Sequence, residues 1–164
     1  MKRRIYFDMD GTLSKWENAS IEIVARPGFF ISRSPVSTVI GALKLLLDEP
    51  SYDIYILSSV YPNGYAEAEK REWNRKHTGI PEEKQIYVSY GTPKAQALSD
   101  FGGVKSNDIL IDDFSFNLKE WPGIGIKLYN GINGTKGSWQ GFCIHSNMNS
   151  GSMATQIKAI IDNT

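Results

Sequence analysis

The sequence has 164 residues, of which 41% are hydrophobic and 22% are charged, as in ordinary globular domains and unlike disordered chains. Its 18 basic and 18 acidic side chains cancel, which argues against an electrostatic grip on long nucleic acid or on an anionic membrane. A single cysteine, Cys143, excludes a disulfide framework and a cysteine-rich zinc cluster. We expect one domain spanning residues 1–164.

Hydrophobic periodicity predicts strands that alternate with helices along the chain. In chain order, the predicted elements are a strand at 5–7, a helix at 36–47, a strand at 53–57, a helix at 66–77, a strand at 85–88, a helix at 93–98, strands at 108–111 and 124–128, and a helix at 152–162. This alternation is typical of an α/β fold with a doubly wound, three-layer parallel sheet. Residues 130–151 predict a surface excursion with one short strand at 142–144.

No apolar run approaches the roughly 18 residues of a membrane-spanning helix, and no run near residue 1 has the length of a secretory leader. We therefore expect a cytoplasmic protein. The charged residues of the helix at 66–77 alternate in sign, so we also expect Lys70, Arg71, Arg75 and Lys76 to lie on a solvated helix face with their glutamate neighbours.

Residues that can contribute to a catalytic site follow four of the predicted strands. In chain order they are Asp8, Asp10, Gly11, Ser58, Ser59, Lys94, Asp112 and Asp113. Ligands of an open parallel sheet bind outside the carboxyl ends of its strands, so we expect these residues to meet in one crevice.

Carboxylates crowded into one crevice repel one another or take up protons unless a cation separates them. Magnesium suits such a cluster because it prefers hard oxygen ligands and keeps positions open for phosphate. A lysine, a small hydroxyl group and the backbone N–H groups of a glycine loop are suited to phosphate oxygens. These residue types together predict a magnesium-dependent phosphoryl-transfer site.

The order of the motifs resembles that of the haloacid dehalogenase superfamily of phosphatases. The motifs are DMDGT at 8–12, a hydroxyl at Ser58 after an apolar strand, Lys94, and ILIDD at 109–113. The resemblance implies that Asp8 is the nucleophile and forms an aspartyl-phosphate, and that Asp10 is the general acid and base. It also implies that Asp8, the backbone carbonyl of Asp10 and Asp113 hold Mg²⁺, with Asp112 supporting them.

A narrower resemblance is to the cytosolic 5'(3')-deoxyribonucleotidases. It rests on the PGFF segment at 27–30, on Trp16 six residues after the second aspartate, and on the EK…W…H-x-G pattern at 69–79. It implies a small cap at about residues 14–35, in which Trp16, Phe29 and Phe30 contact the nucleoside. It also implies that Ser58 and Lys94 bind phosphate, with Gly11 and Ser59 as further phosphate contacts.

The chain departs from that family at several positions. Only fifty residues separate Asp8 from Ser58, so the cap is shorter than in the animal enzymes. Val60 replaces the proline of the family's Thr-Ser-Pro, and Phe114 stands where a basic residue often follows the acidic pair. The short cap leaves room for a larger substrate and puts base and sugar selectivity in question.

The expected function is dephosphorylation of (deoxy)nucleoside monophosphates by a monomer or homodimer that binds neither nucleic acid nor membrane. Several alternatives remain: another phosphate ester, such as a polynucleotide end, a sugar phosphate or a phosphoprotein; a receiver-like signalling domain; and a catalytically inactive nucleotide-binding protein. Singly, the motif residues also fit structural roles. The aspartates suit turns and helix N-caps, and the aromatic residues suit a core.

Overall fold

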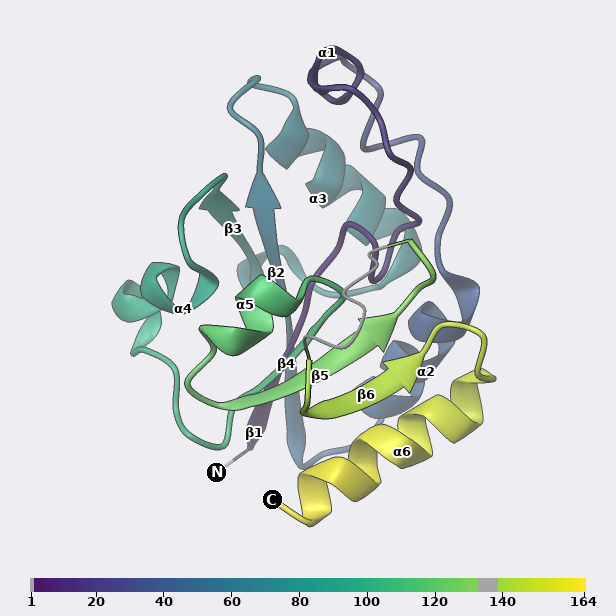
Figure 1. The fold of residues 1–164 in the computed structure, drawn as a ribbon, viewed down its shortest axis with the longest axis vertical. Helices are drawn as coiled ribbons and strands as arrows, with labels where there is room; N and C mark the ends of the chain where they lie inside the picture. Colours follow the sequence, from purple (N-terminus) through teal and green to yellow (C-terminus); the bar gives the residue numbers. More distant parts are fainter. Residues whose placement is uncertain (1, 133–138) are drawn as a thin grey trace.

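A computed structural model describes residues 2–132 and 139–164, in which six strands form one sheet of order β3-β2-β1-β4-β5-β6 (Figure 1). All neighbouring strands are parallel. The strands are β1 (Arg3–Phe7), β2 (Tyr52–Val60), β3 (Gln85–Ser89), β4 (Ile109–Asp112), β5 (Ile124–Tyr129) and β6 (Phe142–His145). The strand order reverses between β1 and β4, which is where open α/β sheets bind their ligands.

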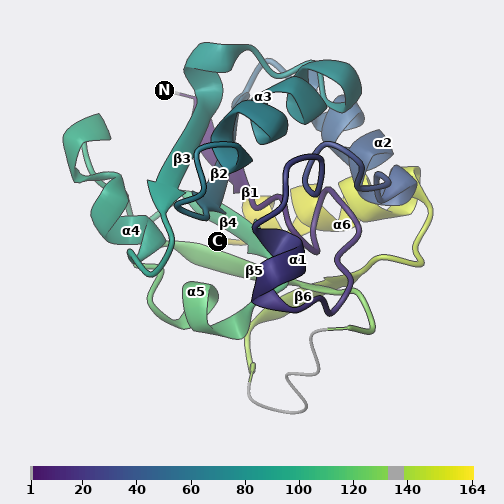
Figure 2. The same ribbon diagram turned by 90° about the horizontal axis from the view of Figure 1, so that it is seen from above.

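Helices cover both faces of this sheet. They are α1 (Ile21–Val24), α2 (Ser37–Leu47), α3 (Ala66–His77), α4 (Lys94–Ala97), α5 (Ser115–Lys119) and α6 (Ser150–Asp162), with short 3₁₀ turns at Glu82–Lys84 and Ser99–Phe101. Figure 2 shows α2, α3 and α6 on one face and α4 and α5 on the other. The predicted doubly wound three-layer fold is thus confirmed.

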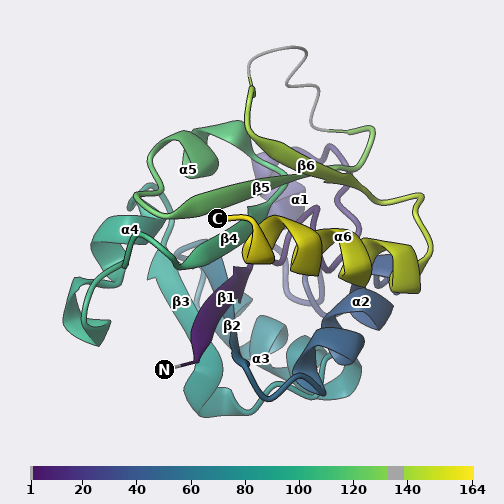
Figure 3. The ribbon, with the colours of Figure 1, turned by 90° about the horizontal axis from the view of Figure 1, so that it is seen from below.

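Strand alternation divides the core into two layers. Ile5 and Phe7 of β1 point into a cluster with α2, α3 and α6, whereas Tyr6 between them joins Leu118 and Trp121 on the opposite face. The last helix, α6, packs along α2 (Figure 3), where the Ser150 hydroxyl donates to the Thr38 carbonyl at 2.9 Å. Burial on both faces explains why the central strands are almost wholly apolar.

The segment between β1 and α2 rises above the carboxyl ends of the strands and contains α1 (Figure 1). Glu69 of α3 fastens this cap. Its carboxylate accepts the backbone N–H groups of Gly28 at 2.6 Å, Phe30 at 3.0 Å and Ile31 at 3.3 Å. The prediction that Glu69 lies on a solvated helix face is therefore wrong. Its partners are backbone N–H groups of the cap, which the charge pattern of the helix does not indicate.

Strand β2 departs furthest from its predicted bounds. Strand β2 runs to Val60, because Ser58 and Ser59 pair with Tyr87 and Val88 of β3; both serines therefore lie within the strand rather than after it. The short strand expected at 142–144 is confirmed as β6, which pairs with β5. Part of the predicted surface excursion, residues 133–138, lies outside the described residues.

Among the helices of residues 2–132 and 139–164, none has both the length and the apolar character that crossing a membrane requires.

Candidate active site

Two acidic turns meet at the carboxyl ends of β1 and β4. Asp8 follows β1 directly, Asp112 ends β4, and Asp113 is next to it. The strands are neighbours, and the Asp8 N–H donates to the Ile111 carbonyl at 2.9 Å. Carboxylate oxygens of Asp8, Asp112 and Asp113 consequently lie within 4.8 Å of one another, all in buried positions. The structure thus brings together three of the four residues named as metal ligands from the sequence.

A tight turn after β1 makes this approach possible. Gly11 has a φ of +86°, a conformation that side-chain-bearing residues rarely adopt. A Cβ atom at this position would collide with the Asp113 carboxylate, so only glycine fits. Asn130, after β5, donates at 2.8 Å to both the Gly11 carbonyl and Asp113 Oδ2. The Gly11 N–H donates to the Ser14 carbonyl at 2.8 Å and is therefore engaged within the turn rather than aimed at a phosphate.

A buried lysine, Lys94, contacts the acidic cluster directly. It begins α4 and is 3% exposed, and its Nζ lies 2.5 Å from Asp8 Oδ1 and 2.6 Å from Asp112 Oδ2. Asp112 also accepts the Phe114 N–H at 2.8 Å and the Asn117 amide at 2.9 Å. A second buried ammonium group, that of Lys127 in β5, donates to the Asp113 carbonyl at 2.6 Å. Three buried carboxylates thus lie near two buried ammonium groups.

Burial shifts the proton affinities of this cluster. It raises the pKa of Asp8 well above its ordinary value; Lys94 opposes that shift, and the charges of Asp112 and Asp113 reinforce it. Burial, together with the neighbouring charge of Asp112, raises the pKa of Asp113 to about 7. For Lys94, burial alone would lower the pKa, but Asp112 and Asp8 raise it above the ordinary value. The ammonium group therefore stays charged, while the carboxylates compete for protons.

A further buried lysine, which was not predicted to be buried, pairs with Asp10. Lys70 of α3 is fully buried and forms an ion pair with Asp10 Oδ2. Its Nζ also donates to Ser58 Oγ at 3.0 Å and to the Ser59 carbonyl at 2.6 Å, and it lies 4.6 Å from the centre of the Phe30 ring. The prediction that Lys70 lies on a solvated helix face is therefore wrong.

The reason for this error is the docking of α3. The buried positions of this helix are Ala66, Lys70, Trp73 and Asn74, which form one stripe at helical spacing. Arg71 and Arg75, by contrast, pair with Glu67 and Glu72 on the outer surface, as expected. The spacing of Lys70 from Ala66 and Trp73 places all three on one helix face and could have indicated burial. The alternation of charges favoured a solvated face instead.

The two predicted phosphate-binding serines have different surroundings. Ser58 is fully buried, and its hydroxyl accepts from Lys70 beneath the pocket. Ser59 lines the pocket itself, together with Asp8, Asp10 and Lys70. Lys70 thus links the end of β2 to the acidic turn after β1.

The pocket above these groups has a volume of about 240 Å³, and its lining includes five aromatic side chains as well as charged ones. Trp16 and Phe30 line it, as predicted for substrate contacts, whereas Phe29 is only 7% exposed and packs edge-to-face behind both of them. Sequence reasoning missed the other lining residues, which are Val24, Tyr61, Tyr90, Phe114 and Asn117. Tyr61 and Tyr90 directly follow β2 and β3, so their position at strand ends was a usable signal.

The donor set fits a hard divalent cation. Its ligands are carboxylate oxygens of three aspartates that lie within 4.8 Å of one another, the type of ligand that Mg²⁺ and Ca²⁺ prefer. The buried Oδ1 of Asp10 has no hydrogen-bond partner within residues 2–132 and 139–164. A buried oxygen of this kind requires a partner, such as a cation or a proton from a ligand.

Comparison of the sequence with models of known protein families finds no match, and a search of curated proteins finds none either.

Proposed function

We propose that the protein is a magnesium-dependent phosphomonoesterase that dephosphorylates (deoxy)nucleoside monophosphates, with the mechanism of haloacid dehalogenase-type phosphatases. One observation carries the proposal: the buried carboxylates of Asp8, Asp112 and Asp113 converge within 4.8 Å, two of them against Lys94, in the lining of a pocket that also contains Asp10. Crowding buried carboxylates together is costly, so a cation that binds between them is favourable.

Asp8 acts as the nucleophile in this proposal. Its carboxylate oxygen attacks phosphorus, and the bond from phosphorus to the nucleoside oxygen breaks as the aspartyl-phosphate forms. Lys94, 2.5 Å from Asp8, places positive charge where the phosphoryl oxygens gather. The Thr12 hydroxyl lies 3.4 Å from Asp8 Oδ2 and 3.3 Å from Asp113 Oδ1, and helps to orient both carboxylates.

Asp10 moves the protons. It donates a proton to the departing nucleoside oxygen, and it then accepts one from the water that attacks phosphorus and breaks the bond to Asp8. Lys70 holds Asp10 Oδ2, so the second oxygen, Oδ1, is left for this exchange. A fixed carboxylate of this kind meets the positioning that phosphoryl transfer demands.

Magnesium would be held by Asp8, by Asp113 and by the backbone carbonyl of Asp10. Asp112 would support these ligands by holding Lys94 in place. When bound, it supplies positive charge that neutralises the transferring phosphoryl group. The aromatic wall of Trp16 and Phe30 supports a nucleoside as the leaving group, since planar rings stack well on aromatic side chains.

Phosphate release from dUMP, dTMP, UMP and a sugar phosphate, each with magnesium and with a chelator, tests the proposal. We expect magnesium-dependent turnover with the nucleotides ahead of the sugar phosphate in kcat/KM. A higher kcat/KM for the sugar phosphate would favour another phosphate ester as substrate. Phosphorylation of Asp8 by a small phosphodonor without turnover of any ester would instead identify a receiver-like domain.

A further inference from the structure

A second hollow adjoins the catalytic pocket and is not used by the proposed mechanism. It has a volume of about 250 Å³ and shares Ser59, Tyr90, Phe114 and Asn117 with the first pocket. Beyond this shared boundary it is lined by residues 91–93 and by Phe116 of α5. The two hollows are therefore parts of one extended cleft, and a single ligand that crosses the shared boundary can fill both.

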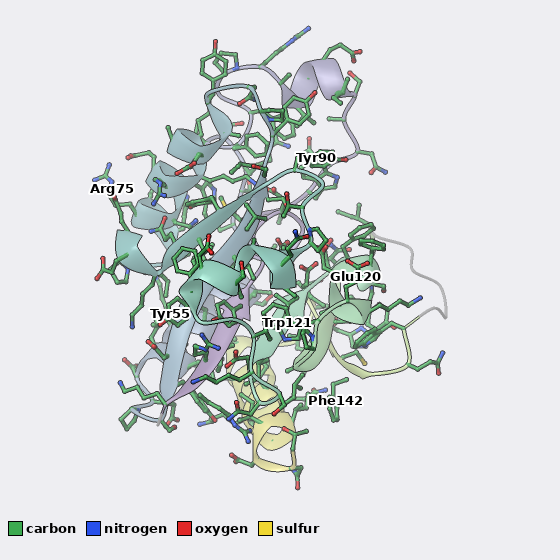
Figure 4. The ribbon with its side chains drawn as sticks, turned by 90° about the vertical axis from the view of Figure 1, so that its left-hand side faces the viewer. Tyr55, Arg75, Tyr90, Glu120, Trp121 and Phe142 are labelled. Carbon is green, nitrogen blue, oxygen red and sulfur yellow. The ribbon has the colours of Figure 1, made fainter. Side chains whose placement is uncertain are left out.

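The aromatic residues that line the second hollow are unusually exposed. Tyr90 is 71% exposed, Phe114 is 49% and Phe116 is 55%. Figure 4 shows Tyr90 in the loop beyond the carboxyl end of β3. The rings form two pairs, Tyr61 with Tyr90 at 6.0 Å between centroids and Phe114 with Phe116 at 6.1 Å. Clustered apolar rings left in water mark a binding surface, because their burial by a ligand is favourable.

The chemistry of the second hollow points to a flat, uncharged ring system. Its lining contains aromatic rings, a proline and the neutral polar side chains of Ser59, Thr92 and Asn117, and it contains no lysine or arginine. Clefts that follow a long nucleic acid backbone use basic residues, which are absent from this lining. Stacking on aromatic side chains, by contrast, accepts any nucleobase.

We propose that the preferred substrate carries two nucleobases: a phosphorylated dinucleotide, or the phosphorylated end of a short single strand. Its terminal phosphate lies at Asp8, its first nucleoside fills the pocket beside Trp16, and its second base stacks in the hollow beside Phe116. This inference rests on the proposed function and narrows its substrate class. The short cap is compatible with it, because the second hollow opens beside α5, away from the cap segment.

The test compares kcat/KM for dTMP, for a thymidine dinucleotide with a terminal phosphate, and for the same dinucleotide with an abasic second residue, in 5'- and 3'-phosphorylated forms. We expect the dinucleotide to exceed dTMP by about ten-fold, the scale of one stacked base, and the abasic compound to lose this advantage. Phe116→Ala should abolish the preference. Phe101→Ala is the matched control: Phe101 is 58% exposed and lines neither hollow, so the preference should persist.

The possible outcomes separate this inference from the proposed function. Turnover of dTMP with equal kcat/KM for the dinucleotide, or an unchanged preference in Phe116→Ala, overturns the two-base inference alone. No turnover of any compound, including p-nitrophenyl phosphate with magnesium, overturns the proposed function and this inference with it. A wild-type dimer that dissociates on Phe116→Ala, seen by sedimentation, would identify the aromatic surface as a contact between two copies and contradict the inference.

Discussion

Lys94 and Lys70 are both buried ammonium groups paired with aspartates of one pocket, but their surroundings differ in charge. Lys94 contacts Asp8 and Asp112 and lies in a cluster of three carboxylates. Lys70 has one carboxylate partner, Asp10, and its other contacts are neutral: the Ser58 hydroxyl, the Ser59 carbonyl and the Phe30 ring.

This difference separates two tasks. In the proposed function, the Lys94 region, where three carboxylates converge, receives a cation and a phosphoryl group. In the Lys70 region one ammonium group meets one carboxylate, so its proposed effect is to fix Asp10 through Oδ2 and to leave Oδ1 for a ligand. Substitutions in the two regions should therefore have different consequences for chemistry, stability and metal dependence.

The largest effect is expected in the Lys94 region, from Asp8→Asn. An amide cannot attack phosphorus, so kcat should fall by about four orders of magnitude, as for removal of other nucleophiles. Phosphate release measured with saturating magnesium checks this. Asp100→Asn removes an exposed carboxylate that lines neither hollow and should leave the rate unchanged. Near-wild-type turnover by Asp8→Asn would exclude Asp8 as the nucleophile.

Lys94→Met should cost both stability and activity. It leaves Asp8 and Asp112 buried without their ammonium partner, which is expected to lower the free energy of unfolding by about 3–5 kcal/mol. We expect kcat to fall by about 10³-fold, because the phosphoryl oxygens lose their fixed positive charge. Urea unfolding and phosphate release measure the two effects. A variant as stable as the wild type would contradict the charge argument.

Lys70→Met should reduce kcat by about 100-fold with little change in KM, because Asp10 loses its fixed orientation while the phosphate contacts remain. Lys70→Arg should recover part of this loss, since it restores a positive charge. The control is Arg71→Met on the next residue of α3, whose ion pair with Glu67 lies at the surface. If KM rose while kcat stayed constant, Lys70 would contact substrate rather than position Asp10.

The smallest effect concerns pH. Burial raises the pKa of Asp113 from an ordinary value near 3.8 to about 7, so the folded protein retains a proton that the unfolded chain releases. The resulting stabilisation is present below the ordinary pKa and is lost as pH rises through about 7. Asp8 shifts in the same direction. Without metal, Tm should therefore fall as pH rises across this interval.

Magnesium competes with these protons, so it should raise Tm more at about pH 8 than at about pH 5. Thermal unfolding with magnesium and with a chelator measures the difference. The same magnesium effect at both pH values would contradict the placement of the cation at Asp8 and Asp113.

The predictable part of the structure follows from apolar strands that end in polar residues. The alternation of strands and helices predicts the parallel sheet, and the carboxyl ends of parallel strands must share an edge. Asp8, Lys94 and the Asp112–Asp113 pair could therefore be expected to meet. Gly11 also stands out in the sequence, and the structure shows why a glycine is needed there: a Cβ atom would collide with the Asp113 carboxylate.

The remaining features depend on tertiary docking. Lys70 is buried because of the face that α3 turns toward the rest of the protein, and the local charge pattern does not indicate which face that is. Phe29 and Phe30 are adjacent and chemically identical, but only Phe30 lines the pocket, because the turn after Gly28 directs Phe29 behind it. Tyr61 and Tyr90 become neighbours only through the pairing of β2 with β3.

The central claim is that Asp8 takes the phosphoryl group while Asp10 controls its release. The most direct measurement uses Asp10→Asn, mixed with substrate and magnesium, quenched in acid and digested for mass spectrometry. We predict that the peptide containing Asp8 carries the mass of one phosphoryl group, and that this mass is absent when a chelator replaces magnesium. An unmodified Asp8 peptide in a variant that still releases nucleoside, or a phosphoryl group on another residue, would contradict the account.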